Sequence, residues 1–418
     1  MELDGAAPPI WRRLDIRSDA PLDMVHQVIQ AAFAWDDAHL HRFSLGGAPF
    51  DPGSQLFLNQ LDVDDPDCND VGIPDSAVRL DETIGEPGDV LRYVYDYGDF
   101  WELTLRLEAV IPSTAASPAA RLVDGERAAP PEDCGGLTDG DALERILTDA
   151  SLFDAEAIIT ELRSPFFVLR EAGIDRRLVE SVHRLRGTSV GEDLKARAQI
   201  LATAPAVLDA ADLADHLVAY RWFLDRAADG ALPLTSAGWL KPAVVAEAVK
   251  VIPEMGDWLV SHVREASCPP LRNFRERLQS MRLLRRFKGE LTLTKAGIAA
   301  RREPQLLWDR LAAELVPATD DPYELQSTLL FLAYAGSTDN ADLPFRELAN
   351  ALTELGWRHA DGQRVEDYSL HYLPARSILV NVADGPVTPE RRRRLSAGAA
   401  ALARAALRGT AGGSLTPR

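Results

Sequence analysis

The sequence has little cysteine. Its three cysteines, Cys68, Cys134 and Cys268, stand far apart among 418 residues, and no CxxC pair occurs. A disulfide framework and a zinc knuckle both need closely spaced cysteines, so we expect neither. Such a chain suits a reducing compartment, and we expect the protein in the cytoplasm.

Long apolar runs are also absent. No stretch approaches the roughly 20 apolar residues that a membrane-spanning helix requires. The opening segment MELDGAAPPIWRR lacks the charged-then-apolar order of a secretion signal. We therefore expect a protein that is neither exported nor inserted into a membrane. At 418 residues the chain is too long for a single core, which predicts two or more domains.

Lysine is missing from the first 150 residues. That part contains 30 Asp and Glu against 10 Arg, whereas the remainder contains 34 acidic and 35 basic residues. Without lysine, the first part also lacks the GxxxxGKS/T loop that cradles phosphates in many nucleotide-binding enzymes. Its surplus of carboxylates repels nucleic acid and favours a basic partner, so we expect an acidic domain that binds a protein.

The first 160 residues combine strand and helix periodicity. Apolar and polar residues alternate over 10–16 and 39–45, which predicts strands, and apolar residues recur at helical spacing over 22–33. A later helix, DALERIL, is expected to begin at Asp141. Together with further alternating segments, this order predicts an α+β domain over 1–160 with a mostly antiparallel sheet.

The segment YVYDYGDFWELTLRLE alternates on both sides of Gly98, which predicts a β-hairpin. Its aspartates admit two interpretations. As turn formers, Asp96 and Asp99 would accept backbone N–H groups while Gly98 takes a positive φ. As site residues, they would face a cleft together with other polar side chains. The second interpretation gives the candidate binding residues His39, His41, Asp96, Asp99, Trp101, Glu132 and Asp133.

The alternative to a binding module is a metal-dependent hydrolase or nuclease built on His39, His41, Asp96, Asp99 and Glu132. The two histidines lie two apart on a predicted strand, so both imidazoles would face one way beside oxygen ligands. An HxH pair alone is not a complete ligand set. Our main expectation is therefore a non-catalytic binding or regulatory module with no catalytic residue, metal or cofactor. His26, on the apolar side of its helix, is expected to be a hydrogen-bonded core residue.

Beyond residue 160 the pattern is mainly helical. We expect a helical connector over 161–230, a winged-helix-like unit over 231–316, a helical or α+β region over 317–408 and a disordered tail over 409–418. The segments LPLTSAG and LTLTKAG lie 59 positions apart, which predicts either a repeated unit or two strands of one small sheet. Between them, a helix from Leu271 to about Leu284 leads into a hairpin with a Lys288-Gly289 turn. A winged helix ends in this order.

Residues 264–302 form a basic window, with 11 Lys and Arg against 3 Glu. A basic helix and wing could lie along a DNA backbone; the alternative is a wing that packs or dimerises. The candidate nucleic-acid contacts, expected to form one exposed patch, are Arg275, Arg282, Arg285, Arg286 and Lys288. A second basic run, 391–394, is expected to be solvated surface.

Four motifs in one order resemble the plasmid pRiA4b Orf-3-like family: PPIWRRLDI, LDMVHQVIQAAFAWDDAHLHRFSLGG, YVYDYGDFWELTLRLE and PPEDCGG. The resemblance covers about residues 7–160 and implies an α+β roll in a family of bacteria and archaea. Some members are labelled resolvase-like passengers of insertion elements. The family usually carries a histidine two residues after the tryptophan, where this chain has Leu103. If that imidazole is a metal ligand in the family, this chain has lost it.

The resolvase label can be tested against the residues of this chain. A serine recombinase needs a nucleophilic serine beside clustered arginines. Ser18 stands in a helix-capping context and Ser44 ends a predicted strand, so we expect no recombinase site.

The helical remainder is similar to the winged-helix-like extension of actinobacterial members of the family.

Overall fold

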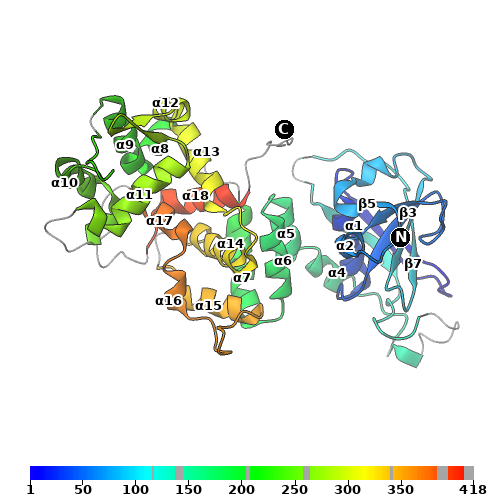
Figure 1. Cartoon of the computed structure of the whole chain (residues 1–418). Helices are drawn as coiled ribbons and strands as arrows, with labels where there is room; N and C mark the ends of the chain where they lie inside the picture. Colours follow the sequence, from blue (N-terminus) through cyan, green and yellow to red (C-terminus); the bar gives the residue numbers. More distant parts are fainter. Residues whose placement is uncertain are drawn as a thin grey trace. The chain divides into compact units, whose positions relative to one another are not determined.

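The computed structural model describes residues 1–114, 117–136, 145–147, 149–203, 208–230, 232–257, 264–338, 342–383 and 394–408. The chain divides into two compact units, Met1–Phe167 and Val168–Arg418 (Figure 1). The first unit extends past the boundary expected near residue 160. The finer division of the second unit stays a prediction.

The first unit is built on an eight-stranded sheet with the order β5-β4-β3-β6-β7-β1-β2-β8. The strands are β1 (Glu2–Leu3), β2 (Trp11–Ile16), β3 (His41–Leu45), β4 (Gln55–Leu58), β5 (Gly72–Pro74), β6 (Val90–Tyr95), β7 (Trp101–Arg106) and β8 (Ala120–Glu126). Neighbouring strands run antiparallel, except that β4 and β5 are parallel. The predicted α+β class with a mostly antiparallel sheet is confirmed.

The first unit also contains helices and 3-10 turns. They are α1 (Leu22–Phe33), α2 (Gln60–Asp64), α4 (Ala155–Glu161), and the 3-10 turns η1 (Asp75–Ala77) and η2 (Leu80–Glu82). The predicted helix over 22–33 coincides with α1, whose residues Leu22, Val25 and Ile29 are fully buried because they recur on one face. A left-handed residue, Ala34 with φ 55°, ends it.

The second unit is mainly helical. Its helices are α6 (Arg176–Arg184), α7 (Ser189–Ala202), α8 (Ala210–His216), α9 (Val218–Ala228), α10 (Pro242–Val251), α11 (Pro269–Ser280), α12 (Lys295–Arg302), α13 (Pro304–Leu315), α14 (Pro322–Gly336), α15 (Phe345–Glu354), α16 (Asp367–Leu370), α17 (Pro374–Val380) and α18 (Ala397–Leu407). The 3-10 turns η3 (Pro253–Asp257) and η4 (Glu265–Ser267) precede α11, and α5 (Pro165–Glu171) crosses the division between the units. Helix α14 lies at the centre of this unit, because every residue from Ser327 to Gly336 is buried.

A small sheet follows α11. Strands β9 (Leu284–Phe287) and β10 (Glu290–Leu293) form a hairpin whose two turn residues, Lys288 and Gly289, have φ values of 48° and 82°. Both positive values suit the two-residue turn predicted there. Helix α11 ends at Ser280, earlier than expected, because the chain already turns at Arg282, where φ is 55°.

The two echoing sequence segments meet in this small sheet. Pro233 forms an antiparallel bridge with Glu290. The Leu291 N–H donates to the Leu232 carbonyl at 3.0 Å, and the Leu234 N–H donates to the Gly289 carbonyl at 2.8 Å. Of the two predicted origins of the echo, the structure therefore fits neighbouring segments of one sheet.

Three predictions fall on residues that the structure does not describe. They are the start of the expected helix at Asp141, the arginines at 391–393 and the tail over 409–418. Among the helices that are described, none combines the length and the apolar character needed to cross a membrane.

Candidate functional site

The hairpin turn between β6 and β7 carries the two aspartates in question. The strands pair as far as Tyr95 and Trp101, so residues 96–100 form the loop. The Asp96 Oδ1 atom accepts the N–H groups of Gly98 at 2.9 Å and of Asp99 at 3.2 Å. Asp96 is therefore a turn former, as one interpretation predicted.

The positive φ that was expected at Gly98 lies elsewhere in the loop. Asp96 has a φ of 57° and Phe100 has a φ of 63°, whereas Gly98 lies outside the left-handed region. Asp tolerates this conformation, but a bulky residue such as Phe rarely adopts it. The loop is thus held by its side-chain contacts, which include the stack of Phe100 on Phe50 at 5.3 Å between ring centroids.

His39 lies directly beside this turn. Its Nε2 atom is 3.1 Å from Asp133 Oδ1 and 3.6 Å from Asp96 Oδ2. These three donor atoms lie within 4.8 Å of one another, close enough to hold one metal ion. The distances allow ion pairs when His39 is protonated, but the angles do not make a hydrogen bond at Nε2. We call His39, Asp96 and Asp133 the turn cluster.

Contacts from Tyr95 and Asp99 hold the turn cluster together. The N–H groups of Ala38 and His39 donate to the Tyr95 hydroxyl at 2.9 and 3.3 Å, and that hydroxyl donates to Glu132. Burial, together with the neighbouring Glu132, raises the pKa of Tyr95. The Gly135 N–H donates to Asp99 Oδ2 at 2.9 Å, which anchors the segment carrying Asp133 to the turn.

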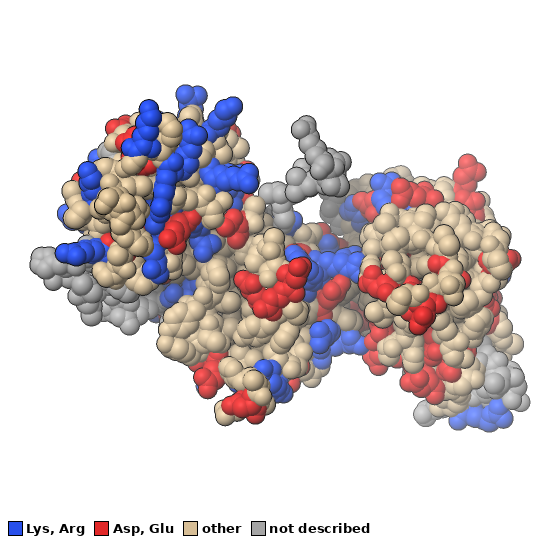
Figure 2. Space-filling model, in the orientation of Figure 1, with Lys and Arg blue, Asp and Glu red and all other residues tan. Residues whose placement is uncertain are grey.

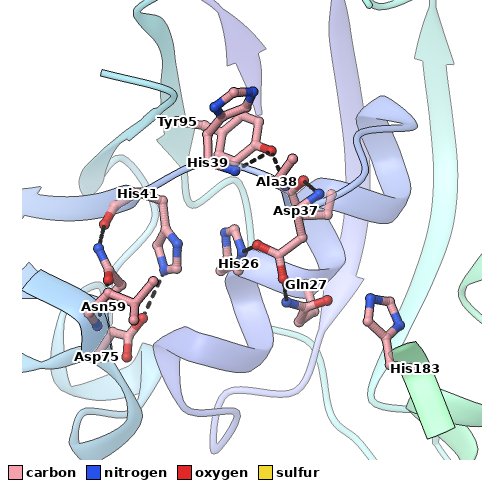
Figure 3. A network of polar contacts seen from close by, with 12 residues as sticks. His26, Gln27, Asp37, Ala38, His39, His41, Asn59, Asp75, Tyr95 and His183 are labelled. Atoms are coloured by element: carbon pink, nitrogen blue, oxygen red, sulfur yellow. Dashed lines mark hydrogen bonds and ion pairs between the residues drawn. The ribbon is translucent and has the colours of Figure 1, made fainter. Parts of the chain in front are cut away.

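His41 does not join His39. Strand β3 begins at His41, so strand alternation does not extend back to His39, and the two imidazoles do not share one face as expected. Figure 3 shows His39 beside Tyr95 and His41 beside His26. The five-residue cluster suggested for a hydrolase is therefore divided between two places.

His41 belongs to a buried network with residues that the sequence did not bring forward as site candidates. The His26 and His41 rings stack with their centroids 3.5 Å apart and their planes inclined by 7°. The His41 Nε2 atom is 2.9 Å from Asp75 Oδ2, and the His26 Nε2 atom is 2.8 Å from Asp37 Oδ1 (Figure 3). His26 also bonds Tyr93 through Nδ1 at 2.8 Å, so the expectation of a hydrogen-bonded core histidine is confirmed.

Contacts within the buried network shift the pKa values of His41 and Asp37. Burial, with the nearby His26 as a second cause, lowers the pKa of His41 to about 4. Burial alone would raise the pKa of Asp37, but the hydrogen bonds from His26 and Gln27, together with the charges of the neighbouring histidines, outweigh it, and the pKa falls to about 2. The two shifts favour a neutral His41 and an ionised Asp37 near neutral pH.

The parallel rings make the buried network a poor metal site, although His26, Asp37 and His41 also bring donor atoms within 4.8 Å of one another. An imidazole binds a metal through a lone pair in its ring plane. Two stacked rings whose centroids lie 3.5 Å apart aim these lone pairs along nearly parallel planes, not at one point. This geometry supports a structural role.

The side chains of Trp101 and Leu103 are both buried in the core of the first unit. Trp101 is 1% exposed and Leu103 is fully buried, opposite Tyr93 on β6. The structure therefore places Trp101 in the core behind the turn and not on its surface. At the position where the related family usually has histidine, an apolar side chain fills the interior.

The second candidate site is the basic hairpin, which we define as Arg282, Arg285, Arg286 and Lys288. All four are exposed. Figure 2 shows blue side chains gathered on the part of the second unit where Figure 1 places α11 and α12. Over the described ranges of the chain, no ion pair joins these four side chains to a carboxylate.

Arg275 corrects the predicted patch. Its side chain is fully buried and bonds Glu265, which is itself fully buried, with a further contact to Glu276 Oε1 at 3.3 Å. It faces inward because it sits on the same side of α11 as Leu271, Phe274 and Leu278. Arg275 is therefore part of the interior of the second unit and is unavailable to DNA.

The described geometry defines the first unit as an acidic α+β domain with a polar cluster at its hairpin turn. Residues 1–168 match the family model described as plasmid pRiA4b ORF-3-like protein. A curated relative, the uncharacterized protein y4hQ of Sinorhizobium fredii, is 28% identical over 135 residues, which cover 32% of this chain and 63% of the relative. This chain thus spans less than two thirds of that relative's length.

A solved structure is also similar to the chain. It is the crystal structure of a protein of unknown function, MM3350, from Methanosarcina mazei Go1. The match has 25% sequence identity and a TM-score of 0.31, and it covers 37% of this chain and 92% of that one.

Proposed function

We propose that this protein is a non-catalytic binding protein whose second unit contacts double-stranded DNA through the basic hairpin. The observation that carries the proposal is the group of four exposed cations on one β-hairpin and directly before it, with no carboxylate partner within the described residues. Cations that are not neutralised by their own protein are available to neutralise phosphates.

The surrounding elements support this proposal. Helices α10 and α11 precede the hairpin, and the segment at Pro233 adds to β10 as a third extended segment. This order of helices and strands is the order of a winged helix, in which the hairpin is the wing. Along β9 only Leu284 is buried, while Arg285, Arg286 and Phe287 are exposed. Both faces of the strand end are thus open to a partner.

The side chains of the hairpin suit a phosphate backbone. Arg presents a planar fork that binds phosphate oxygens in pairs. Phe287 is 48% exposed, and the Arg285 guanidinium and the Lys288 ammonium lie 5.4 and 5.3 Å from its ring centroid. These contacts hold both cations against the Phe287 ring. The arrangement favours contacts to the backbone, which position a protein on DNA without reading its sequence.

We propose a separate role for the acidic first unit. Its surplus carboxylates repel phosphates, which would confine DNA contact to the second unit. The same charge favours a partner protein with a basic surface. One chain could then hold DNA through one unit and a basic protein through the other.

The experiment compares two charge-reversed variants of the full chain. Arg285→Glu/Arg286→Glu changes the hairpin, and Arg346→Glu/Arg364→Glu changes two exposed arginines of the same unit that pair with their own carboxylates. Binding to a short labelled DNA duplex is followed by fluorescence anisotropy at several salt concentrations. We expect the hairpin variant to bind weakly, with a plot of log affinity against log salt that is shallower by about two units of slope, and the control to behave like the parent.

Two results would overturn the proposal. One is a parent whose affinity for the duplex equals that of the hairpin variant at low salt. The other is a hairpin variant that has lost self-association, measured by light scattering, while its DNA affinity is unchanged. That second result would assign the hairpin to dimerisation.

A further inference from the structure

We propose that the turn cluster, His39, Asp96 and Asp133, is a binding site for a divalent transition-metal cation. The site is independent of the DNA contact proposed above, because it lies wholly within the first unit. Its three donors come from three segments of the chain: the approach to β3, the β6–β7 turn and the loop after β8.

The distances between donor atoms fit one ion. Ligand atoms bound at about 2.1 Å lie about 3.0–3.4 Å apart in octahedral or tetrahedral coordination. His39 Nε2 lies 3.1 Å from Asp133 Oδ1 and 3.6 Å from Asp96 Oδ2. Both distances lie within a few tenths of an ångström of that range, and the two carboxylate oxygens lie within 4.8 Å of each other, so a small closure of the cluster would bring the donors around one ion.

The direction of the imidazole supports an ion over a simple ion pair. The Nε2 atom of His39 is shielded from solvent, yet it makes no hydrogen bond among the described residues, although a carboxylate oxygen lies 3.1 Å away. In a metal complex the ion occupies the lone-pair axis, so the other ligands lie about 35–45° off that axis. The missing hydrogen bond at 3.1 Å places Asp133 Oδ1 off this axis, as a ligand of a shared ion would be.

The two carboxylate oxygen atoms of Asp96 have different roles: one bonds the backbone of the turn and the other faces the proposed ion. Asp96 uses Oδ1 for two N–H groups of the turn, which leaves Oδ2 directed at His39. Asp99 fixes the Asp133 segment through Gly135, and the Tyr95 hydroxyl accepts the His39 N–H. Metal sites commonly have such outer contacts, which orient the ligands.

The donor set selects the class of cation. One imidazole nitrogen with carboxylate oxygens suits Mn²⁺, Fe²⁺ or Zn²⁺, whereas Ca²⁺ and Mg²⁺ prefer oxygen ligands alone. The acidic surroundings of the first unit add a general attraction for cations, so a test must separate the cluster from this background.

Mn²⁺ is the probe, because its electron spin reports directly on a bound nitrogen. Full-length protein is treated with a chelator, dialysed and titrated with Mn²⁺. The variants are His39→Ala and Asp133→Asn; the matched controls are His359→Ala and Glu86→Gln, which change an exposed histidine and an exposed carboxylate elsewhere. Asp133 is 77% exposed, so its replacement is expected to leave the fold intact.

We expect both site variants to bind Mn²⁺ about tenfold more weakly or worse, and both controls to bind like the parent. Pulsed electron paramagnetic resonance is expected to show ¹⁴N coupling in the parent and in the controls, and none in His39→Ala. Zn²⁺ should displace the Mn²⁺ far better than Mg²⁺ or Ca²⁺.

The proposal fails if the parent shows no ¹⁴N coupling. It also fails if the controls weaken binding as much as the site variants, or if Mg²⁺ displaces Mn²⁺ as well as Zn²⁺ does. Any of these results would leave His39 and Asp133 as an ion pair. DNA binding by the hairpin would be unaffected, so the two proposals fail separately.

Discussion

The arginines that we compare in the two compact units differ in burial and in their bonding partners. In the first unit, Arg12 is 3% exposed and donates to the backbone carbonyls of Ala32, Glu126 and Arg127. Arg42 is equally buried and pairs with Asp62 and Asp70. In the second unit, the arginines of the basic hairpin extend from the surface, and no described carboxylate pairs with them.

This difference shows that the composition of a segment is an incomplete guide to its surface. The first unit contains eleven arginines, and at least two of them hold its interior together. Three aspartates, Asp62, Asp75 and Asp96, are buried as well, so charges of both signs are withdrawn from its surface. Within the basic window of the second unit, Arg275 belongs to the interior while its neighbours on the hairpin do not.

The largest effect is expected at Arg275, whose replacement tests this division within the second unit. Arg275→Met leaves the buried carboxylate of Glu265 without its cation, which should lower the free energy of unfolding by about 3–5 kcal/mol. Arg285→Met, at an exposed position, should change it by less than about 0.5 kcal/mol. Urea unfolding of both variants checks the contrast. Equal losses would show that Arg275 is not the interior residue described.

A slightly smaller effect is expected at Arg12 in the first unit. Arg12→Met removes one buried and two partly buried hydrogen bonds to backbone carbonyls, and a buried carbonyl left without a donor costs about 1–3 kcal/mol, so a total near 3 kcal/mol is expected. The neighbouring Arg13 pairs with Glu108 at the surface, and Arg13→Met should cost no more than about 1 kcal/mol. Hydrogen exchange of β2 measures both. If Arg13→Met lowers the free energy of unfolding more than Arg12→Met does, the contrast between the buried and the exposed arginine is wrong.

The sequence predicted those parts of the first unit that depend on local periodicity. Helix α1 and the hairpin β6–β7 were found because their apolar residues recur at 3.6 and 2 positions. His39, Asp96 and Asp133 were among the candidates, and the structure brings them together. The turn chemistry of Asp96 followed from its side chain alone.

Features that depend on long-range packing were not predictable in this way. The stack of His26 on His41 exists because α1 lies against the start of β3, and no pattern within either segment specifies that placement. Arg275 bonds Glu265, ten positions earlier and outside its own helix. Phe100 takes a left-handed conformation that sequence rules assign to glycine, since its ring stacks on Phe50.

The buried network predicts a dependence of stability on pH. The pKa of His41 is about 4 in the folded protein, below the ordinary value of 6.5. As the pH falls below 6.5, the unfolded chain takes up a proton that folded His41, stacked on His26 and bonded to Asp75, does not. The free energy of unfolding should therefore fall between pH 6.5 and 4, by up to about 3 kcal/mol. Below pH 3.8, Asp37, with a folded pKa of about 2, adds a further loss.

His41→Gln tests this prediction, because glutamine keeps a donor for Asp75 but does not titrate. Hydrogen exchange of β3, measured from pH 7 to 4, should give a flatter profile for this variant than for the parent. His359→Gln, at an exposed histidine of the second unit, should leave the profile unchanged. A parent profile that is already flat would contradict the burial of a neutral His41.

The smallest effects are expected at Asp96, where three substitutions separate its two tasks in metal-free buffer. Asp96→Asn keeps an oxygen acceptor and tolerates a φ of 57°, so it should change the free energy of unfolding by less than about 0.5 kcal/mol. Asp96→Gly keeps the conformation but loses the acceptor for Gly98 and Asp99, at a cost of about 1 kcal/mol. Asp96→Ala loses both and should cost about 2 kcal/mol, because alanine also pays for the left-handed backbone. Urea unfolding ranks the three. If Asp96→Asn instead stabilised the fold, repulsion among the carboxylates near His39 would outweigh the turn, and the hairpin would be strained by its site.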